Sequence, residues 1–163
     1  MTTADQRPGV YEAMGGREAC TRLAHAWHER VMADEVVAHA FSHGFHPEHT
    51  ERLAAYLAET LGGPADFSER LGSHAGVVRM HAGNSDHQEM DDRAEACFAQ
   101  ALADADIPEP VRPTLRAYWH WATRLMAAYP RSAEDVPEAP MPHWTWDGPV
   151  TATDGTDPQT SAR

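Results

Sequence analysis

One histidine, His81, stands between two helical stretches of the sequence, with the apolar pair Val77 and Val78 before it and small residues after it. A neutral imidazole nitrogen is a good metal ligand, and a histidine in this setting has the properties that an axial ligand of haem iron needs, because the flat macrocycle requires apolar walls. The alternative is a surface or capping histidine in an inter-helix loop. We expect the segment 65–80 to be a loop with at most a turn or two of helix.

Eleven histidines are the unusual feature of the composition. His28 and His49 lie on the inward side of amphipathic stretches. They either bond backbone carbonyls at the edge of the core or line one cavity over the group that His81 holds. His43, His46 and His49 follow at steps of three and could bind a divalent metal, although the glycine and proline between them favour an irregular turn. The remaining histidines are interpreted as surface residues: His25, His39, His74, His87, His120 and His143.

Charge and composition exclude several classes of function. The net charge is −12 with histidine neutral, and all 13 basic residues are arginine, so neither nucleic acid nor an anionic membrane is expected as a partner. The chain has no phosphate-binding glycine motif, no apolar signal core and no run of about 18 apolar residues, which predicts a cytoplasmic protein. Cys20 and Cys97 lie in apolar helical stripes and are expected to be buried free thiols.

Apolar residues recur at intervals of three and four along most of the chain, and no segment alternates with a period of two, so we predict an all-α domain. Asp34 is a plausible helix cap, and the glycine pairs 15–16 and 62–63 are expected to end helices. The expected helices cover 10–14, 17–32, 35–41, 47–61, 86–105 and 111–129.

We expect three regions along the chain. Residues 1–9 are polar and predicted to be flexible, and residues 10–129 form the helical domain. Residues 130–163 hold six of the twelve prolines and are predicted to be an extended tail. Trp144 and Trp146 would leave much apolar area exposed in a free tail, so part of it is expected to dock on the helices.

Several motifs, taken in order, resemble those of group II truncated haemoglobins over about residues 10–129. They are Val10-Tyr-Glu-Ala-Met-Gly-Gly16, Trp27-His28, Asp34-Glu-Val-Val37, Phe41, Glu51-Arg-Leu-Ala-Ala-Tyr-Leu57, Gly62-Gly-Pro64 and Arg79-Met-His81. The resemblance implies a truncated globin, a two-over-two helical sandwich around haem b (iron protoporphyrin IX). His81 would then be the proximal ligand of the iron.

The resemblance also implies roles for other residues. Phe41 matches the aromatic residue on the porphyrin face, and Arg79 is a candidate partner of a haem propionate. The distal pocket positions match Leu53, Tyr56 and Leu57.

Two departures from the family's pattern bear on function. The family usually has a tyrosine at His28 and a tryptophan at Ala94, and both normally donate hydrogen bonds to the iron-bound ligand. The donors expected here are His28 and His49, with Tyr56 as a further candidate. Ala94 implies a larger cavity.

Three functions follow from these patterns. The first is a haem protein that binds O2 or another small ligand held by His28 and His49; either histidine could instead bind the iron directly. The second is a haem oxidoreductase in which a distal histidine moves protons to and from a substrate such as peroxide. The third is a haem-free, histidine-rich module that binds a metal or a partner protein. The haem functions require an unidentified reductase for the iron, and the sequence allows a homodimer.

Overall fold

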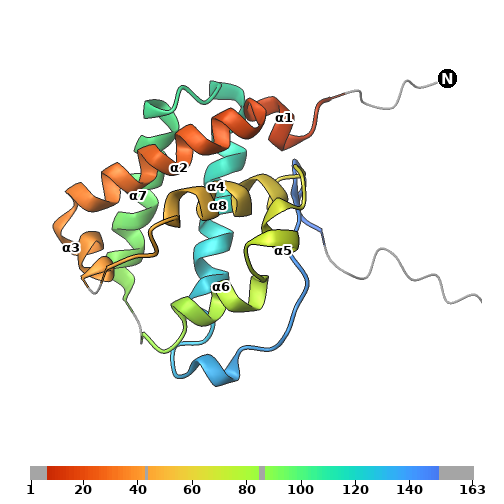
Figure 1. Ribbon diagram of the computed structural model, residues 1–163. Helices are drawn as coiled ribbons and strands as arrows, with labels where there is room; N and C mark the ends of the chain where they lie inside the picture. Colours follow the sequence, from red (N-terminus) through yellow and green to blue (C-terminus); the bar gives the residue numbers. More distant parts are fainter. Residues whose placement is uncertain (1–6, 43, 85–86, 151–163) are drawn as a thin grey trace, which may run out of the picture.

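The computed structural model describes residues 7–42, 44–84 and 87–150, and these residues form a bundle of helices with one small hairpin (Figure 1). His43, residues 1–6 of the predicted flexible N-terminus and residues 151–163 of the predicted tail lie outside the described residues. The α-helices are α1 (Val10–Met14), α2 (Gly16–Ala33), α3 (Glu35–Ala38), α4 (His49–Thr60), α5 (Asp66–Arg70), α6 (His74–His81), α7 (Gln88–Asp104) and α8 (Arg112–Met126). The chain also has three described 3₁₀ turns, η1 (His39–Phe41), η2 (Glu109–Val111) and η3 (Ala133–Asp135).

The four long helices form two packed pairs. Helix α2 packs against α4 and also against α7, and α7 packs against α8. In Figure 1, α8 crosses behind α4, while α6 lies below the crossing. The main core is shared by α1, α2, α4, α7 and α8, and its largest fully buried side chains include Leu23, Leu57, Phe98, Leu115 and Tyr118. The predicted all-α, two-over-two architecture is therefore confirmed.

Local signals end and begin several helices as predicted. Gly15, which follows α1, has φ of 116°, a left-handed conformation that glycine adopts without steric cost. The Asp34 carboxylate accepts hydrogen bonds from the backbone N–H groups of Val36 and Val37 and so caps α3. Both cysteines are buried free thiols, and burial raises the pKa of Cys20 to about 12.

The segment 65–80 was expected to be mostly loop, and that expectation is wrong. It contains α5 and α6, and α6 delivers His81 at its last residue. The Ser73 hydroxyl caps α6 by accepting a hydrogen bond from the Gly76 N–H at 3.0 Å. The inward face of α6 is narrow, because only two of its apolar residues, Ala75 and Val78, are buried. Such a stripe gives little helical periodicity in the sequence.

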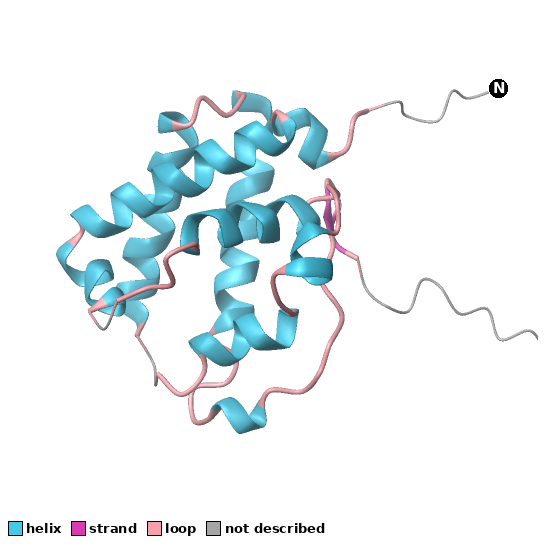
Figure 2. Cartoon of the chain, in the orientation of Figure 1, coloured by secondary structure: helices cyan, strands magenta, loops and turns pink. Residues whose placement is uncertain are grey.

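The segment after α8 returns along the outside of the helices and ends in a hairpin of β1 (Trp144–Thr145) and β2 (Gly148–Pro149) (Figure 2). Trp144 is buried, with its ring 5.9 Å from Tyr118 and 5.5 Å from Trp121. Trp146 donates its indole N–H to the Pro8 carbonyl at 2.9 Å. None of the described helices is long and apolar enough to cross a membrane.

Candidate functional site

Four aromatic rings meet where α2, η1 and the start of α4 come together. They belong to His28, Phe41, Phe45 and His49, which we call the ring cluster. The ring centroids of His28 and His49 lie 5.7 Å apart, that of Phe45 lies 4.8 Å from His28, and that of Phe41 lies 5.3 Å from His49. The structure thus brings His28, His49 and Phe41 together from three separate elements.

The two histidines of the ring cluster each hold a buried nitrogen that lacks a protein partner. Within the described residues, Nδ1 of His28 and Nδ1 of His49 make no hydrogen bond. Burial lowers the pKa of His49, and the nearby imidazoles of His28 and His81 lower it further. His49 is therefore a neutral imidazole at pH 7. Buried polar atoms are nearly always paired in folded proteins, so these two nitrogens are candidates for a hydrogen bond to a polar ligand.

His81, at the end of α6, has a fixed ring tautomer. Its Nδ1 lies 2.8 Å from the Val77 carbonyl oxygen, one helical turn earlier. A carbonyl oxygen only accepts, so Nδ1 carries the proton and donates it to this bond. The neutral ring then has its lone pair on Nε2, and the hydrogen bond orients that nitrogen as metal-ligating histidines usually are. The side chain is exposed, and its imidazole is close enough to His49 to affect that residue electrostatically.

Ala94 lies on α7. It packs against the buried side chains of Val31, Val37 and Cys97, and Trp27 and Phe41 pack against the same three side chains. Ala94 thus packs on the same buried side chains as one aromatic residue of α2 and one of η1.

The three distal positions on α4 differ in their surroundings. Leu57 is buried in the main core, and Leu53 packs against that core while remaining partly exposed. Tyr56 is buried, and its hydroxyl lies 2.9 Å from Nδ1 of His74. The hydroxyl of Tyr56 is thus engaged by His74 and not by the ring cluster.

His74 was interpreted as a surface residue, and this is wrong. Its side chain is only 7% exposed, and burial lowers its pKa. A hydrogen bond to Tyr56 satisfies its Nδ1, and its ring stacks on the Tyr56 ring at 6.3 Å. The sequence pattern missed this residue because its partner is 18 positions earlier, on another helix.

Arg79 lies on α6 and contacts the segment that follows η3. Its guanidinium donates to the Glu138 carboxylate at 2.7 Å and to the Val136 carbonyl at 3.4 Å. Val136 is buried beside Ala75 and Val78 of α6. The chain after α8 therefore packs on the helix that carries His81.

His43, the first member of the three-step histidine series, lies outside the described residues. No group of three or more His, Cys, Asp or Glu side chains in these residues could hold a metal ion. His46 is exposed, and its Nδ1 accepts a hydrogen bond from the Glu48 N–H.

Sequence reasoning missed three aromatic residues around the site. Phe45 belongs to the ring cluster, although the sequence indicated only a turn there. Trp27 stacks near His49 with ring centroids 6.4 Å apart, and Trp119 of α8 lies 5.1 Å from Trp27. Trp27 directly precedes His28 in the sequence. This adjacency was the one feature of the sequence that could have placed Trp27 beside the ring cluster.

Comparisons with known proteins identify a matching family and several similar solved structures. A family profile described as bacterial-like globin matches residues 9–126. A haemoglobin from Chloroflexus aurantiacus is 30% identical, with a TM-score of 0.64, and the match covers 74% of this chain and 98% of that one. A haemoglobin from Thermobifida fusca is 31% identical, with a TM-score of 0.62, covering 73% of this chain and 96% of that one.

The group II truncated haemoglobin of Bacillus anthracis is 20% identical, with a TM-score of 0.66, and the match covers 75% of this chain and 92% of that one. No match was found among curated proteins. Both the family profile and the structural neighbours agree with the resemblance seen in the sequence. The chain therefore belongs to the bacterial-like globin family and has the fold of the group II truncated haemoglobins.

Proposed function

We propose that this chain is a haem-binding truncated haemoglobin in which His81 ligates the iron and the ring cluster holds O2 or another small ligand. The observation that carries the proposal is the bond from Nδ1 of His81 to the Val77 carbonyl, because it leaves Nε2 as the free donor nitrogen. Membership of a globin family implies haem as the cofactor. We assign haem b, because neither cysteine is exposed for a covalent attachment.

On the distal side, ring nitrogens of two histidines lie among apolar rings, an arrangement that suits a small polar ligand. The bound haem would supply an iron atom that binds small ligands reversibly. Phe41 and Phe45 supply apolar walls, and His28 and His49 supply the two buried nitrogens that have no hydrogen-bond partner among the described residues. Because His49 is neutral at pH 7, its ring has one N–H to donate and one nitrogen to accept.

Titration of the full chain with haemin tests the proposal. The wild type and His87→Ala, which changes an exposed histidine after the same inter-helix segment, should give a Soret band that saturates near one haem per chain. His81→Ala should lose this band or shift it. Equal spectra and equal haem retention in all three proteins would refute ligation by His81.

Release of the small ligand tests the distal residues. A hydrogen bond between neutral groups contributes about 1 kcal/mol, so His28→Leu and His49→Leu should each speed O2 dissociation roughly fivefold. His25→Leu, an exposed residue one turn earlier on α2, is the matched control and should leave the rate unchanged. If the His28→Leu and His49→Leu rates equalled that of the control, the distal assignment would be wrong.

The neutral state of His49 also favours a second function, haem-dependent reduction of peroxide. A half-buried imidazole with a lowered pKa is ready to take a proton from peroxide and return it to the departing oxygen. Peroxide-dependent oxidation of a dye should exceed that of free haemin and fall in His49→Leu. Turnover no faster than free haemin would exclude this second function.

A further inference from the structure

Two tryptophans link the ring cluster with the face of α8 that packs against α7. Trp27 lies beside His49, with ring centroids 6.4 Å apart, and the centroids of Trp27 and Trp119 are 5.1 Å apart. Trp119 then stacks flat on Phe98, with centroids 4.2 Å apart and an angle of 4° between the planes. Electronic coupling between aromatic rings falls steeply with distance, so ring-to-ring contacts of this kind favour the passage of single electrons.

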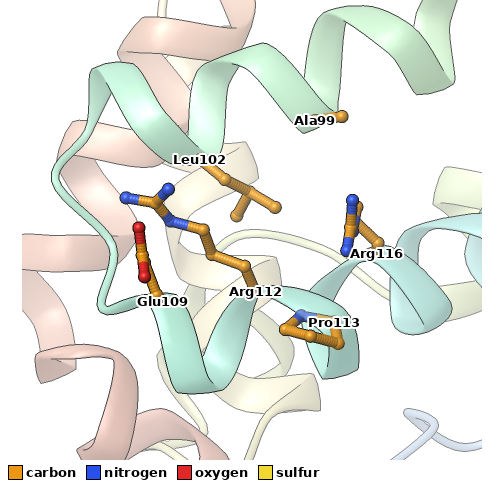
Figure 3. Close-up of a pocket in the computed structure, with 6 residues that line it drawn as sticks. All are labelled: Ala99, Leu102, Glu109, Arg112, Pro113 and Arg116. Atoms are coloured by element: carbon orange, nitrogen blue, oxygen red, sulfur yellow. The ribbon is translucent and has the colours of Figure 1, made fainter.

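Trp119 is half-buried and lines a surface groove between α7 and α8. One part of the groove, about 210 Å³, is bordered by Phe98, Ala99, Arg116 and Trp119. An adjoining part, about 290 Å³, shares Ala99 and Arg116 and extends to Arg112. Figure 3 shows Arg112 and Arg116 on the same side of α8, facing Ala99 and Leu102 of α7.

The groove combines an aromatic wall with a positive charge. The Arg112 guanidinium donates to the Ile107 carbonyl at 2.7 Å, whereas Arg116 makes no ion pair within the described residues. Two carboxylates also border the groove. Glu95 accepts hydrogen bonds from His120 and Thr123, and Glu109 lies at the opposite end, beside Arg112. Arg116 is thus the charged group next to the aromatic wall that remains free for a ligand.

We propose that Trp27 and Trp119 conduct single electrons from this groove to the haem pocket, and that the electron donor in the groove is a small phenol carrying a carboxylate. The phenol ring would lie against Trp119 and the carboxylate would pair with Arg116. The inference rests on the proposed haem site and adds a substrate class and a second, surface site to it.

The reaction is balanced with hydrogen peroxide as the oxidant. Each phenol loses one electron and its hydroxyl proton and becomes a phenoxyl radical. Two such electrons and two protons reduce one peroxide to two water molecules. Trp119 and Trp27 are oxidised and reduced again in turn. The indole nitrogens of both are buried and lack an acceptor within the described residues, so each tryptophan keeps its proton and passes through a cation radical.

Locating the radical gives a test that does not depend on turnover. The haem-loaded full chain, first shown to have its Soret band, is mixed with peroxide and a spin trap and digested for mass spectrometry. The expected adduct is on Trp119 in the wild type and is lost in Trp27→Phe and Trp119→Phe. Trp121→Phe is the matched control, since Trp121 lies on the same helix but packs on Tyr118 and Trp144, and it should keep the adduct.

A Soret band without any adduct on Trp119 would overturn the electron path while leaving the haem assignment intact. An adduct on Trp119 that persists in Trp27→Phe would also overturn it. A missing Soret band in the wild type would instead contradict the proposed function itself. Because Trp119→Phe keeps an aromatic ring against Phe98, its folding can be checked separately by circular dichroism.

The substrate class is tested with two phenols of similar size. Arg116→Gln should raise the KM for 4-hydroxyphenylacetate up to about fivefold, the effect of losing an exposed ion pair of about 1 kcal/mol, and should leave the KM for uncharged 4-methylphenol unchanged. Arg124→Gln, an exposed arginine farther along α8, is the control. Equal changes with both phenols, or none with either, would show that Arg116 does not bind the carboxylate.

Discussion

His28, His49 and His74 differ in whether the protein satisfies their buried ring nitrogens. His74 is paired with the Tyr56 hydroxyl, whereas the Nδ1 atoms of His28 and His49 are buried without a partner in the described residues. An unpaired buried nitrogen costs free energy unless a ligand occupies its hydrogen-bonding position. This contrast is why we assign the first histidine to structure and the other two to binding.

At the residue scale, His74 predicts how stability depends on pH. Its pKa is lowered in the folded state, so the unfolded chain binds the proton more readily. The contribution of His74 to the free energy of unfolding is fully present above pH 6.5 or so, since about 6.5 is the pKa of a histidine in the unfolded chain. This contribution falls as the pH drops from there through the folded pKa, by at most about 1.4 kcal/mol per pH unit. Urea unfolding of the apoprotein between pH 7.5 and 5 should show this loss.

His74→Gln supplies the comparison, because the amide can still bond Tyr56 but does not titrate. Its stability should fall less steeply with decreasing pH than that of the wild type. The exposed His25→Gln should keep the steeper wild-type dependence. Parallel curves for the wild type and His74→Gln would mean that His74 does not carry the effect.

The sequence predicted the placement of some site residues and missed that of others. The interpretation of His28 and His49 as inward-facing came from their positions on amphipathic stripes, a property of the local sequence. The burial of His74 and the Arg79–Glu138 ion pair depend on partners 18 and 59 positions away in the chain. No local pattern contains such pairs. The predicted binding roles of His81, His28 and His49 remain predictions.

At the element scale, the long helices and the short helices α1 and α3 were predictable, whereas α5 and α6 were not. The expected stretches 17–32 and 86–105 correspond to α2 and α7, whose apolar faces span several turns. Helix α6 has eight residues and Gly76 in its interior, so propensity and periodicity are both weak. Tertiary packing on Val136 stabilises it, and the sequence of α6 alone does not reveal that contact.

The end of α4 gives a prediction at this scale. A Cβ atom on Gly63 would lie 2.7 Å from the Ala58 carbonyl and 2.8 Å from the Tyr11 ring. Gly63→Ala should therefore lower the free energy of unfolding by about 1–3 kcal/mol, because α1 must move away from α4. Urea denaturation measures this change.

Gly9→Ala is the control, since a Cβ there meets no atom within 4 Å and should change stability by less than about 0.5 kcal/mol. Equal stabilities for the Gly63 and Gly9 variants would show that the contact between Tyr11 and the end of α4 is not tight.

At the scale of the whole molecule, the segment after α8 connects distant parts of the fold. It covers α6 through Val136 and Glu138, and it then places Trp144 on α8. Farther along, Trp146 reaches the N-terminal segment, with the Arg7 guanidinium 3.5 Å from its ring. The segment thus links the His81 helix, α8 and the chain's first described residues.

Trp144→Ala should test how much this segment stabilises the globin helices. Removing a buried tryptophan leaves a cavity, and we expect a loss of about 3 kcal/mol. Trp146→Ala removes a half-buried ring, one hydrogen bond and one cation–π contact, and should cost about 1 kcal/mol. Thermal unfolding of both variants gives the comparison, and a Trp144→Ala protein as stable as the wild type would mean that the hairpin is not docked in solution.

The central claim is that the His81 imidazole holds the iron, and chemical rescue of the cavity variant His81→Gly tests it most directly. Without imidazole, this haem-reconstituted variant should differ from the wild type in its ferrous absorption spectrum and should lack the iron–imidazole stretching band in resonance Raman. Added free imidazole should restore both. A variant that keeps the wild-type spectrum and band without imidazole would contradict the claim.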